Sequence, residues 1–131
     1  MKPVRLLALA AAACALAGAG GAQAEPNVAQ YEQFTGDQGT PETKVVFPMW
    51  LAGVGLGFQW MNSEFIKRGQ PAAFCPPETF GASADQFDAL LHDYLKKRRA
   101  ALDVQRQADL AEFPTGLVLL NAMKDAFPCK K

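Results

Sequence analysis

Residues 83–99, SADQFDALLHDYLKKRR, carry the clearest structural signal in this chain. Ser83 is a preferred N-cap residue, and Gln86 three positions later completes a capping-box pattern. Asp85 suits the positive start of a helix dipole, and the basic run 96–99 suits its negative end. The segment therefore predicts an amphipathic helix. Its large apolar side chains recur at steps of three and four and form one stripe: Phe87, Leu90, Leu91, Tyr94 and Leu95.

The segment before it, residues 44–68, is strongly apolar, and its large side chains recur at helical steps. Pro48 is expected near the start of this helix, where its missing N–H costs nothing. Each interior glycine costs about 0.5–1 kcal/mol relative to alanine, so the glycines need a reason. Gly53 and Gly57 lie four positions apart on one face, and we predict that they let another helix approach closely. A phosphate-binding loop is the alternative, but G-x-G-x-G without a preceding strand is not the dinucleotide pattern.

The segments around these two helices have simpler patterns. Residues 69–82 contain three prolines and two glycines and predict a loop. Residues 100–113 are polar and predict a short helix or an ordered excursion. Pro114 then starts a last helix that runs through Ala126, and Pro128 ends it. We expect its apolar side to consist of Leu117, Leu120, Met123 and Phe127, with Val118 and Ala122 beside them.

The first 24 residues have the three zones of a secretory signal: a basic start, an apolar run at 6–16 and the ending Ala22-Gln23-Ala24. The apolar run is shorter than the roughly 20 residues that a membrane span needs. We therefore predict cleavage near Ala24, export to the periplasm and no membrane span. A lipoprotein anchor at Cys14 is the alternative, although the usual leucine three positions earlier is missing.

The rest of the chain divides into two parts. Residues 25–43 are polar and punctuated by glycine and proline, and they predict an irregular N-terminal arm. Residues 44–131 are expected to form the folded domain. We predict an all-α fold for it, a small helical domain of about four helices with one disulfide.

Two cysteines, Cys75 and Cys129, remain after the predicted cleavage. An even pair of cysteines in an exported domain predicts a disulfide. The bond would close a loop of about 55 residues and would stabilise the fold by roughly 4 kcal/mol. It would also join the end of the last helix to the loop before Ser83, which brings those two helices together.

The sequence contains no catalytic pattern. The whole chain has 13 basic and 13 acidic residues and no basic stripe, so it does not predict nucleic-acid binding. Its one histidine, His92, lies inside a predicted helix, and the predicted disulfide removes Cys75 as a thiol nucleophile. A lone histidine with scattered carboxylates lacks metal-ligand spacing. We expect no enzyme activity, no metal and no cofactor, and we expect a surface that binds a partner.

A family resemblance makes this expectation more specific. Residues 74–78 read FCPPE and residues 121–129 read NAMKDAFPC, and between them stand the pairs Gln86-Phe87, Tyr94-Leu95 and Leu117-Val118. This pattern, over residues 48–129, resembles the Rap/Tai family of type VI secretion amidase immunity proteins. Two features depart from the family. Residues 47–53 read FPMWLAG where members often have C-x-x-Y-x-x-G, and residues 96–99 replace a His-Pro turn.

The resemblance implies an α-helical periplasmic protein, often a homodimer, that occludes the active site of an injected peptidoglycan amidase. The segment 96–109 is long, polar and poor in core residues, so we expect it to supply the contacts. The candidate contact residues are Arg98, Arg99, Gln105 and Arg106. A small periplasmic acid-stress chaperone, or an envelope factor with another partner, is the alternative.

Overall fold

Five helices form residues 25–130, the part of the chain that the computed structural model describes. They are α2 (Val28–Thr35), α3 (Pro41–Lys67), α4 (Ala84–Ala101), α5 (Val104–Ala111) and α6 (Thr115–Ala126). No strand occurs among these residues, and the one isolated bridge joins Asn27 to Pro114. The all-α prediction is confirmed, with one helix more than expected. The predicted signal segment and Cys14 lie outside the described residues.

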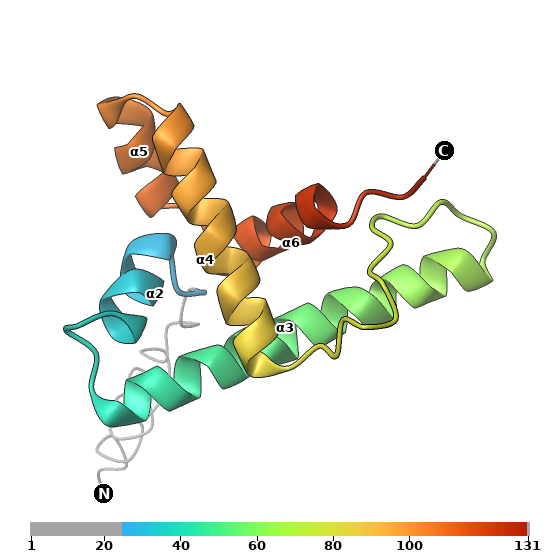
Figure 1. Ribbon diagram of the computed structural model, residues 1–131, viewed down its shortest axis with the longest axis horizontal. Helices are drawn as coiled ribbons and strands as arrows, with labels where there is room; N and C mark the ends of the chain where they lie inside the picture. Colours follow the sequence, from blue (N-terminus) through green and yellow to red (C-terminus); the bar gives the residue numbers. More distant parts are fainter. Residues whose placement is uncertain (1–24, 131) are drawn as a thin grey trace, which may run out of the picture.

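The long helix α3 is the base of the fold, and α4 crosses it (Figure 1). In this view α2 and α6 lie on the same side of α3 as α4, and α5 lies farthest from α3. The core fills the space between α2, α3, α4, α6 and the loop after α3. Its fully buried large side chains include Tyr31, Leu51, Phe74, Phe87, Leu91, Leu119 and Met123.

Helix α4 begins as the sequence predicts. The Ser83 hydroxyl accepts a hydrogen bond from the Gln86 N–H, and the Gln86 side chain accepts one from the Ser83 N–H, both at 3.3 Å. Phe87, Leu91 and Leu95 of the predicted stripe are buried. Leu90 and Tyr94 lie at its edges and are only partly buried. The stripe therefore faces α3 and α6.

The predicted irregular arm at 25–43 is wrong, because most of it is helical. Asn27 caps α2 by accepting a hydrogen bond from the Gln30 N–H at 2.9 Å, and the Gln30 side chain completes a capping box. Val28 and Tyr31 are buried. The Tyr31 hydroxyl also donates a hydrogen bond to Asp88 of α4. Two apolar anchors and one cap are therefore enough to fix this short helix against the core.

The expected start of α3 is also wrong. Thr40 is its N-cap and Pro41 occupies the first turn, so the helix begins one turn before Lys44. A proline at the first helical position fits because its fixed φ matches the helix and its missing N–H has no partner to lose. Pro48 instead stands inside the helix. Its ring removes the hydrogen bond to the carbonyl of Lys44, an exposed position where water is available.

The glycine that permits close packing is Gly55, and the prediction for Gly53 and Gly57 is wrong. An added Cβ at Gly55 would lie 2.3 Å from the Phe87 ring of α4. At Gly53 and Gly57 an added Cβ would meet nothing within 4 Å. Because Gly55 is on the opposite side of the helix, α4 crosses α3 over Gly55.

Alanine substitutions distinguish these glycines. Gly53→Ala is expected to raise the free energy of unfolding by about 0.5–1 kcal/mol, because the site is open and alanine favours the helix. Gly55→Ala is expected to lower it by about 1–3 kcal/mol, because the methyl group overpacks against Phe87. Urea unfolding of the two variants would measure both changes. Equal effects at the two positions would contradict this packing.

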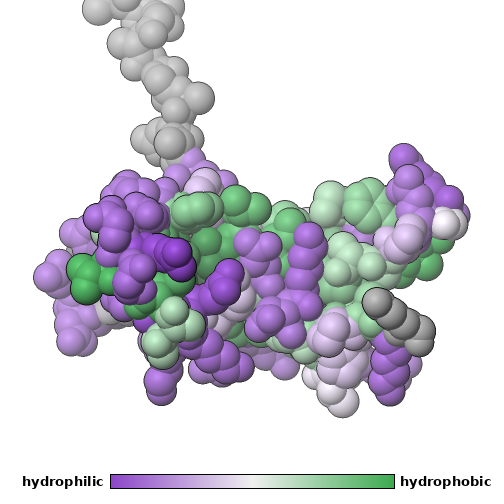
Figure 2. Space-filling model, turned by 90° about the horizontal axis from the view of Figure 1, so that it is seen from above, coloured by the Kyte–Doolittle hydropathy of each residue, from purple (hydrophilic) through white to green (hydrophobic). Residues whose placement is uncertain are grey.

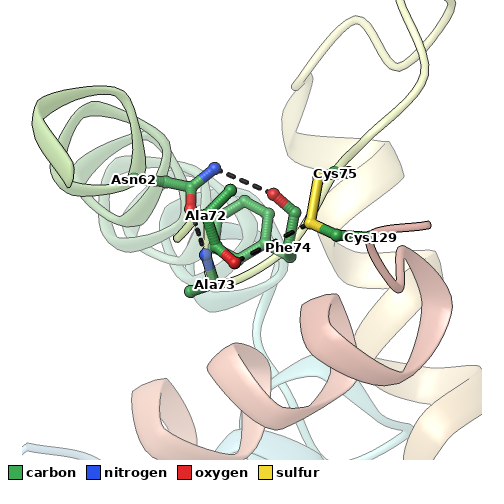
Figure 3. Close-up of a disulfide and its surroundings, with 6 residues drawn as sticks. All are labelled: Asn62, Ala72, Ala73, Phe74, Cys75 and Cys129. Carbon is green, nitrogen blue, oxygen red and sulfur yellow. Dashed lines mark hydrogen bonds between the residues drawn. A yellow bond between two sulfur atoms is a disulfide. The ribbon is translucent and has the colours of Figure 1, made fainter. Parts of the chain in front are cut away.

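The disulfide prediction is confirmed: Cys75 and Cys129 are bonded, with their Cα atoms 4.9 Å apart. The Cys75 N–H donates a hydrogen bond to the Phe127 carbonyl at 2.8 Å, so backbone pairing accompanies the bond. Asn62 of α3 holds the same loop from the other side. Its side-chain amide donates to the Phe74 carbonyl at 2.9 Å, and its oxygen accepts from the Ala73 N–H at 2.7 Å (Figure 3).

Helix α6 runs from Thr115 to Ala126 as expected, but its inward side is turned by about one position. Leu117 is 45% exposed, whereas Leu119 is fully buried. The shift follows from what covers the helix, since α4 and α3 contact the side that carries Leu119. The buried side of α6 consists of Thr115, Gly116, Val118, Leu119, Ala122 and Met123.

The link between α2 and α4 gives the fold a dependence on alkaline pH. Burial raises the pKa of Tyr31 well above its ordinary value, and the hydrogen bond to Asp88 raises it further. The folded state therefore favours the neutral phenol. This contribution to stability is present below pH 10, the ordinary tyrosine pKa, and is lost progressively as the pH rises above it.

Tyr31→Phe is therefore expected to cost about 1.5 kcal/mol at pH 7, where a hydrogen bond to a charged acceptor is lost. The difference in unfolding free energy between the natural chain and the variant is expected to shrink between pH 9 and pH 11. Urea unfolding at several pH values would measure it. A difference that does not change with pH would contradict the assigned role of Tyr31.

Candidate partner-binding groove

A groove lies where the end of α4, α5 and the outer side of α6 meet. Its main hollow has a volume of about 260 Å³. A second hollow of about 500 Å³ adjoins it and shares Tyr94, Arg98 and Asn121 with it. We call the two together the α4–α6 groove. Its other lining residues are Lys97, Leu102, Arg106, Asp109, Leu110, Phe113, Val118, Lys124 and Asp125.

Local hydrogen bonds build the corner between α4 and α5. Asp103 caps α5 by accepting a hydrogen bond from the Arg106 N–H at 2.9 Å. The Gln107 side chain donates to the carbonyls of Arg99 and Leu102 at 3.0 and 2.9 Å. These carbonyls belong to the end of α4, where the helix leaves its last acceptors unpaired. The corner is therefore fixed by polar contacts, and Gln107 is its central residue.

The far end of α5 is fastened to the segment before α2. The Val28 N–H donates to the Phe113 carbonyl at 3.0 Å, and the Thr115 N–H donates to the Pro26 carbonyl at 2.9 Å. The Asn27 side chain also donates to Glu112 at 3.2 Å. No residue of α5 is buried. The exposed side chains of α5 can therefore serve binding without a role in the core.

The α4–α6 groove combines cations with aromatic side chains. The guanidinium carbon of Arg98 lies 5.6 Å from the centre of the Tyr94 ring. Arg106 lies on the facing helix, and its Nε is 3.7 Å from an Asp103 oxygen on an exposed surface. Figure 2 shows mostly hydrophilic residues at the α5 end of the molecule, with a few hydrophobic ones among them. Lys97, Arg98, Arg106 and Lys124 outnumber Asp109 and Asp125 in the lining. The groove is basic and suits an acidic surface.

Two of the four predicted contact residues meet in this groove. Arg98 and Arg106 both line its main hollow, although eight positions and a helix boundary separate them in the chain. The corner after Ala101 brings α5 back over the end of α4. These two arginines therefore act on the same volume.

Arg99 and Gln105 do not line the groove. Arg99 faces α2, and its guanidinium lies 2.5 Å from a carboxylate oxygen of Glu32. With 38% of its side chain exposed, Arg99 ties α4 to α2 and is taken up by the fold. Gln105 donates a hydrogen bond to Asp109 at 3.3 Å on the exposed side of α5.

Sequence reasoning missed the aromatic part of the site. Tyr94 belongs to the predicted apolar stripe of α4, but it lies at the edge where α6 leaves it partly open. Phe113 is 47% exposed at the turn before α6. A cationic run one turn after a tyrosine at a stripe edge is the signal that would have indicated this pairing.

The described residues contain no arrangement that resembles a metal centre or a membrane span. Between residues 25 and 130 no three histidine, cysteine, aspartate or glutamate side chains gather as a metal site would require. No described helix combines the length and the apolar character needed to cross a bilayer. His92 is exposed on α4 beside Glu32 and Lys96, which line a separate shallow hollow.

Fold and groove together define a small helical domain, stapled by one disulfide, with a basic and aromatic groove at one end. No protein-family model, curated protein or solved structure matches this chain. The function is therefore inferred from the residues of the domain itself.

Proposed function

We propose that this chain is an exported, non-catalytic binding protein, and that its partner docks in the α4–α6 groove. The observation that carries the proposal is the gathering of Arg98, Arg106 and Tyr94 around one hollow. Arginine and tyrosine are the residue types that most often dominate binding energy at protein interfaces. Export agrees with the disulfide, because such bonds persist in oxidising compartments.

We further propose that the partner is a secreted peptidoglycan amidase and that the chain is its immunity protein. The two most specific segments of the Rap/Tai resemblance, 74–78 and 121–129, lie against each other through the Cys75–Cys129 bond. Their proximity supports reading them as one motif. Inhibition by occlusion needs shape and polar complementarity and no catalytic group.

The charge of the groove constrains the docking. Four cations line it, so the amidase surface that it covers is expected to carry carboxylates. Charge complementarity of this kind speeds association and disfavours wrong partners. The resemblance also implies a homodimer. A dimer would leave the groove free only if the two copies met elsewhere.

Reversing the two groove arginines tests the proposal. Arg98→Glu with Arg106→Glu is expected to weaken binding to the amidase at least tenfold, because like charges would face the acidic surface. Titration calorimetry and inhibition of peptidoglycan cleavage would measure the loss. Lys44→Glu is the matched control, since it reverses an exposed charge on α3 outside the groove. Circular dichroism would confirm that the helices persist.

The outcomes separate the candidate functions. Tight stoichiometric capture of one amidase at neutral pH, lost in the groove variant, supports the immunity role. Binding of unfolded proteins only after acidification would support the chaperone instead. An unchanged amidase affinity in the groove variant would refute the α4–α6 groove as the docking site.

A further inference from the structure

The side of α3 that faces away from the core is apolar and uncovered. Trp60 is 71% exposed and Met49 is 64% exposed, and Val45 and Val46 are each more than half exposed. Residues 45–63 contain no charged side chain. We call this surface the α3 outer face. It consists of Glu42, Val45, Val46, Met49, Gly53, Leu56, Gly57, Trp60 and Lys67.

Helical geometry explains why these residues share one side. At about 100° per residue, Met49, Gly53 and Trp60 fall within a narrow sector. The buried positions Leu51 and Gly55 fall on the opposite side of the helix. In Figure 1 the helices α2, α4 and α6 all lie above α3, and no described helix lies below it. Within the described residues the α3 outer face therefore has no covering element.

The open glycines belong to the same face. Nothing within residues 25–130 lies within 4 Å of a Cβ built at Gly53 or Gly57. Each of them costs helix stability without a packing contact inside the chain. Glycines four apart allow the backbone of a second helix to approach closely. They favour a helical partner over a flat or irregular one.

We propose that the partner is a second copy of this chain, bound through antiparallel pairing of the two α3 helices. The twofold axis would pass between Val54 and Gly55. Met49 and Trp60 lie equally far on either side of that point, and so do Gly53 and Leu56. Trp60 of each copy then covers Met49 of the other, and Leu56 fits over the gap at Gly53.

The charges at the ends of the face favour this arrangement. Glu42 and Lys67 are also equidistant from the same point, so each would meet its opposite charge on the other copy. Lys67 already lies 2.8 Å from Glu64 within its own helix and would bridge both carboxylates. A twofold interface requires this kind of self-complementary surface. A membrane surface or an unrelated protein would not require matched spacings.

The proposal does not depend on the amidase. The α3 outer face lies on the other side of the molecule from the α4–α6 groove, so a dimer leaves both grooves accessible. Failure of the amidase experiment would leave the dimer untouched. Failure of the dimer would equally leave the groove experiment valid.

Sedimentation equilibrium of the purified, oxidised chain tests self-association. The natural chain is expected to be dimeric at micromolar concentration. Trp60→Glu is expected to raise the dissociation constant at least a hundredfold, because it places two charges in an apolar interface. Val104→Glu is the matched control, since Val104 is an 85% exposed apolar residue on α5 and is expected to leave the dimer intact.

Cysteine cross-linking tests the register. A mixture of Met49→Cys and Trp60→Cys chains is expected to form a covalent heterodimer under mild oxidation, because the pairing places the two positions opposite each other. Each variant alone is expected to cross-link poorly. Its two equivalent positions would stand about 16 Å apart along the helices, far beyond disulfide reach.

Three results would overturn the proposal. The first is a natural chain that remains monomeric at 100 µM. The second is a dimer that Val104→Glu disrupts and Trp60→Glu does not. The third is a mixture of the two cysteine variants that cross-links no better than either variant alone.

Discussion

Replacing both Cys75 and Cys129 with alanine is expected to lower the free energy of unfolding by about 4 kcal/mol. The bond joins residues 54 positions apart. In the chain-entropy account, closing a loop of this length restricts the unfolded state by roughly that amount. A domain of this size has a total stability of about 5–15 kcal/mol, so the loss removes a large part of it. Urea unfolding at pH 7 would measure the change.

The natural chain unfolded in the presence of a strong reductant is the matched control, and it should lose a similar amount. The contacts around the bond bound the result from below. The Cys75 N–H still reaches the Phe127 carbonyl, and Phe80 still packs on Phe127 with ring centres 4.9 Å apart. A loss below about 1 kcal/mol would mean that these contacts, and not the bond, hold the two segments together.

The elements that the sequence predicts well are those whose signals are local and redundant. Helix α4 has a capping box, a charged end and a continuous apolar stripe, and all three agree. Helix α6 is bounded by Pro114 and Pro128. The disulfide follows from counting the cysteines left after the predicted cleavage. In each case no knowledge of distant contacts is needed.

The elements that the sequence predicts poorly depend on distant contacts. The apolar residues of α2 are too few to show a period, and its main anchor is Asp88, which lies 57 positions from Tyr31. The glycines of α3 occur at every second position, so their spacing cannot tell which side faces α4. Phe87 decides for Gly55. Local periodicity gives the helix but leaves its rotation undetermined.

The same limit applies to the candidate groove. The basic run 96–99 spreads around the helix, because neighbouring residues differ by about 100°. Arg98 therefore faces Tyr94 and the groove, whereas Arg99 faces Glu32 on α2. Only the position of α2, which the sequence did not predict, separates the roles of these two arginines. The polar character of 96–109 was enough to locate the surface but not its residues.

Asn62→Ala is expected to lower the free energy of unfolding by about 4 kcal/mol. Asn62 is 6% exposed and is one of the two buried polar or charged residues of the described core. Its side chain makes two hydrogen bonds to the loop backbone, at Ala73 and Phe74 (Figure 3). Alanine would leave a backbone donor and a backbone acceptor without partners, and each such group costs about 1–3 kcal/mol when buried.

Ser63→Ala is the matched control for Asn62→Ala. Ser63 is the next residue of α3, it is exposed, and its hydroxyl donates to the Gln59 carbonyl of its own helix at 3.0 Å. Its replacement is expected to change stability by less than 0.5 kcal/mol, the usual range for surface sites. An equal loss at both positions would contradict a specific role for Asn62.

Asn62 and the disulfide fasten neighbouring residues of one loop, so their contributions should not be independent. With the bond present, Ala73 and Phe74 are held close to Asn62 even in partly open states. Without it, the loop can move away and expose its polar groups to water, which lowers the cost of losing Asn62. The combined variant is therefore expected to lose less than the sum of the separate losses, by at least 0.5 kcal/mol. Losses that simply add would show that α3 and the last helix hold the loop independently.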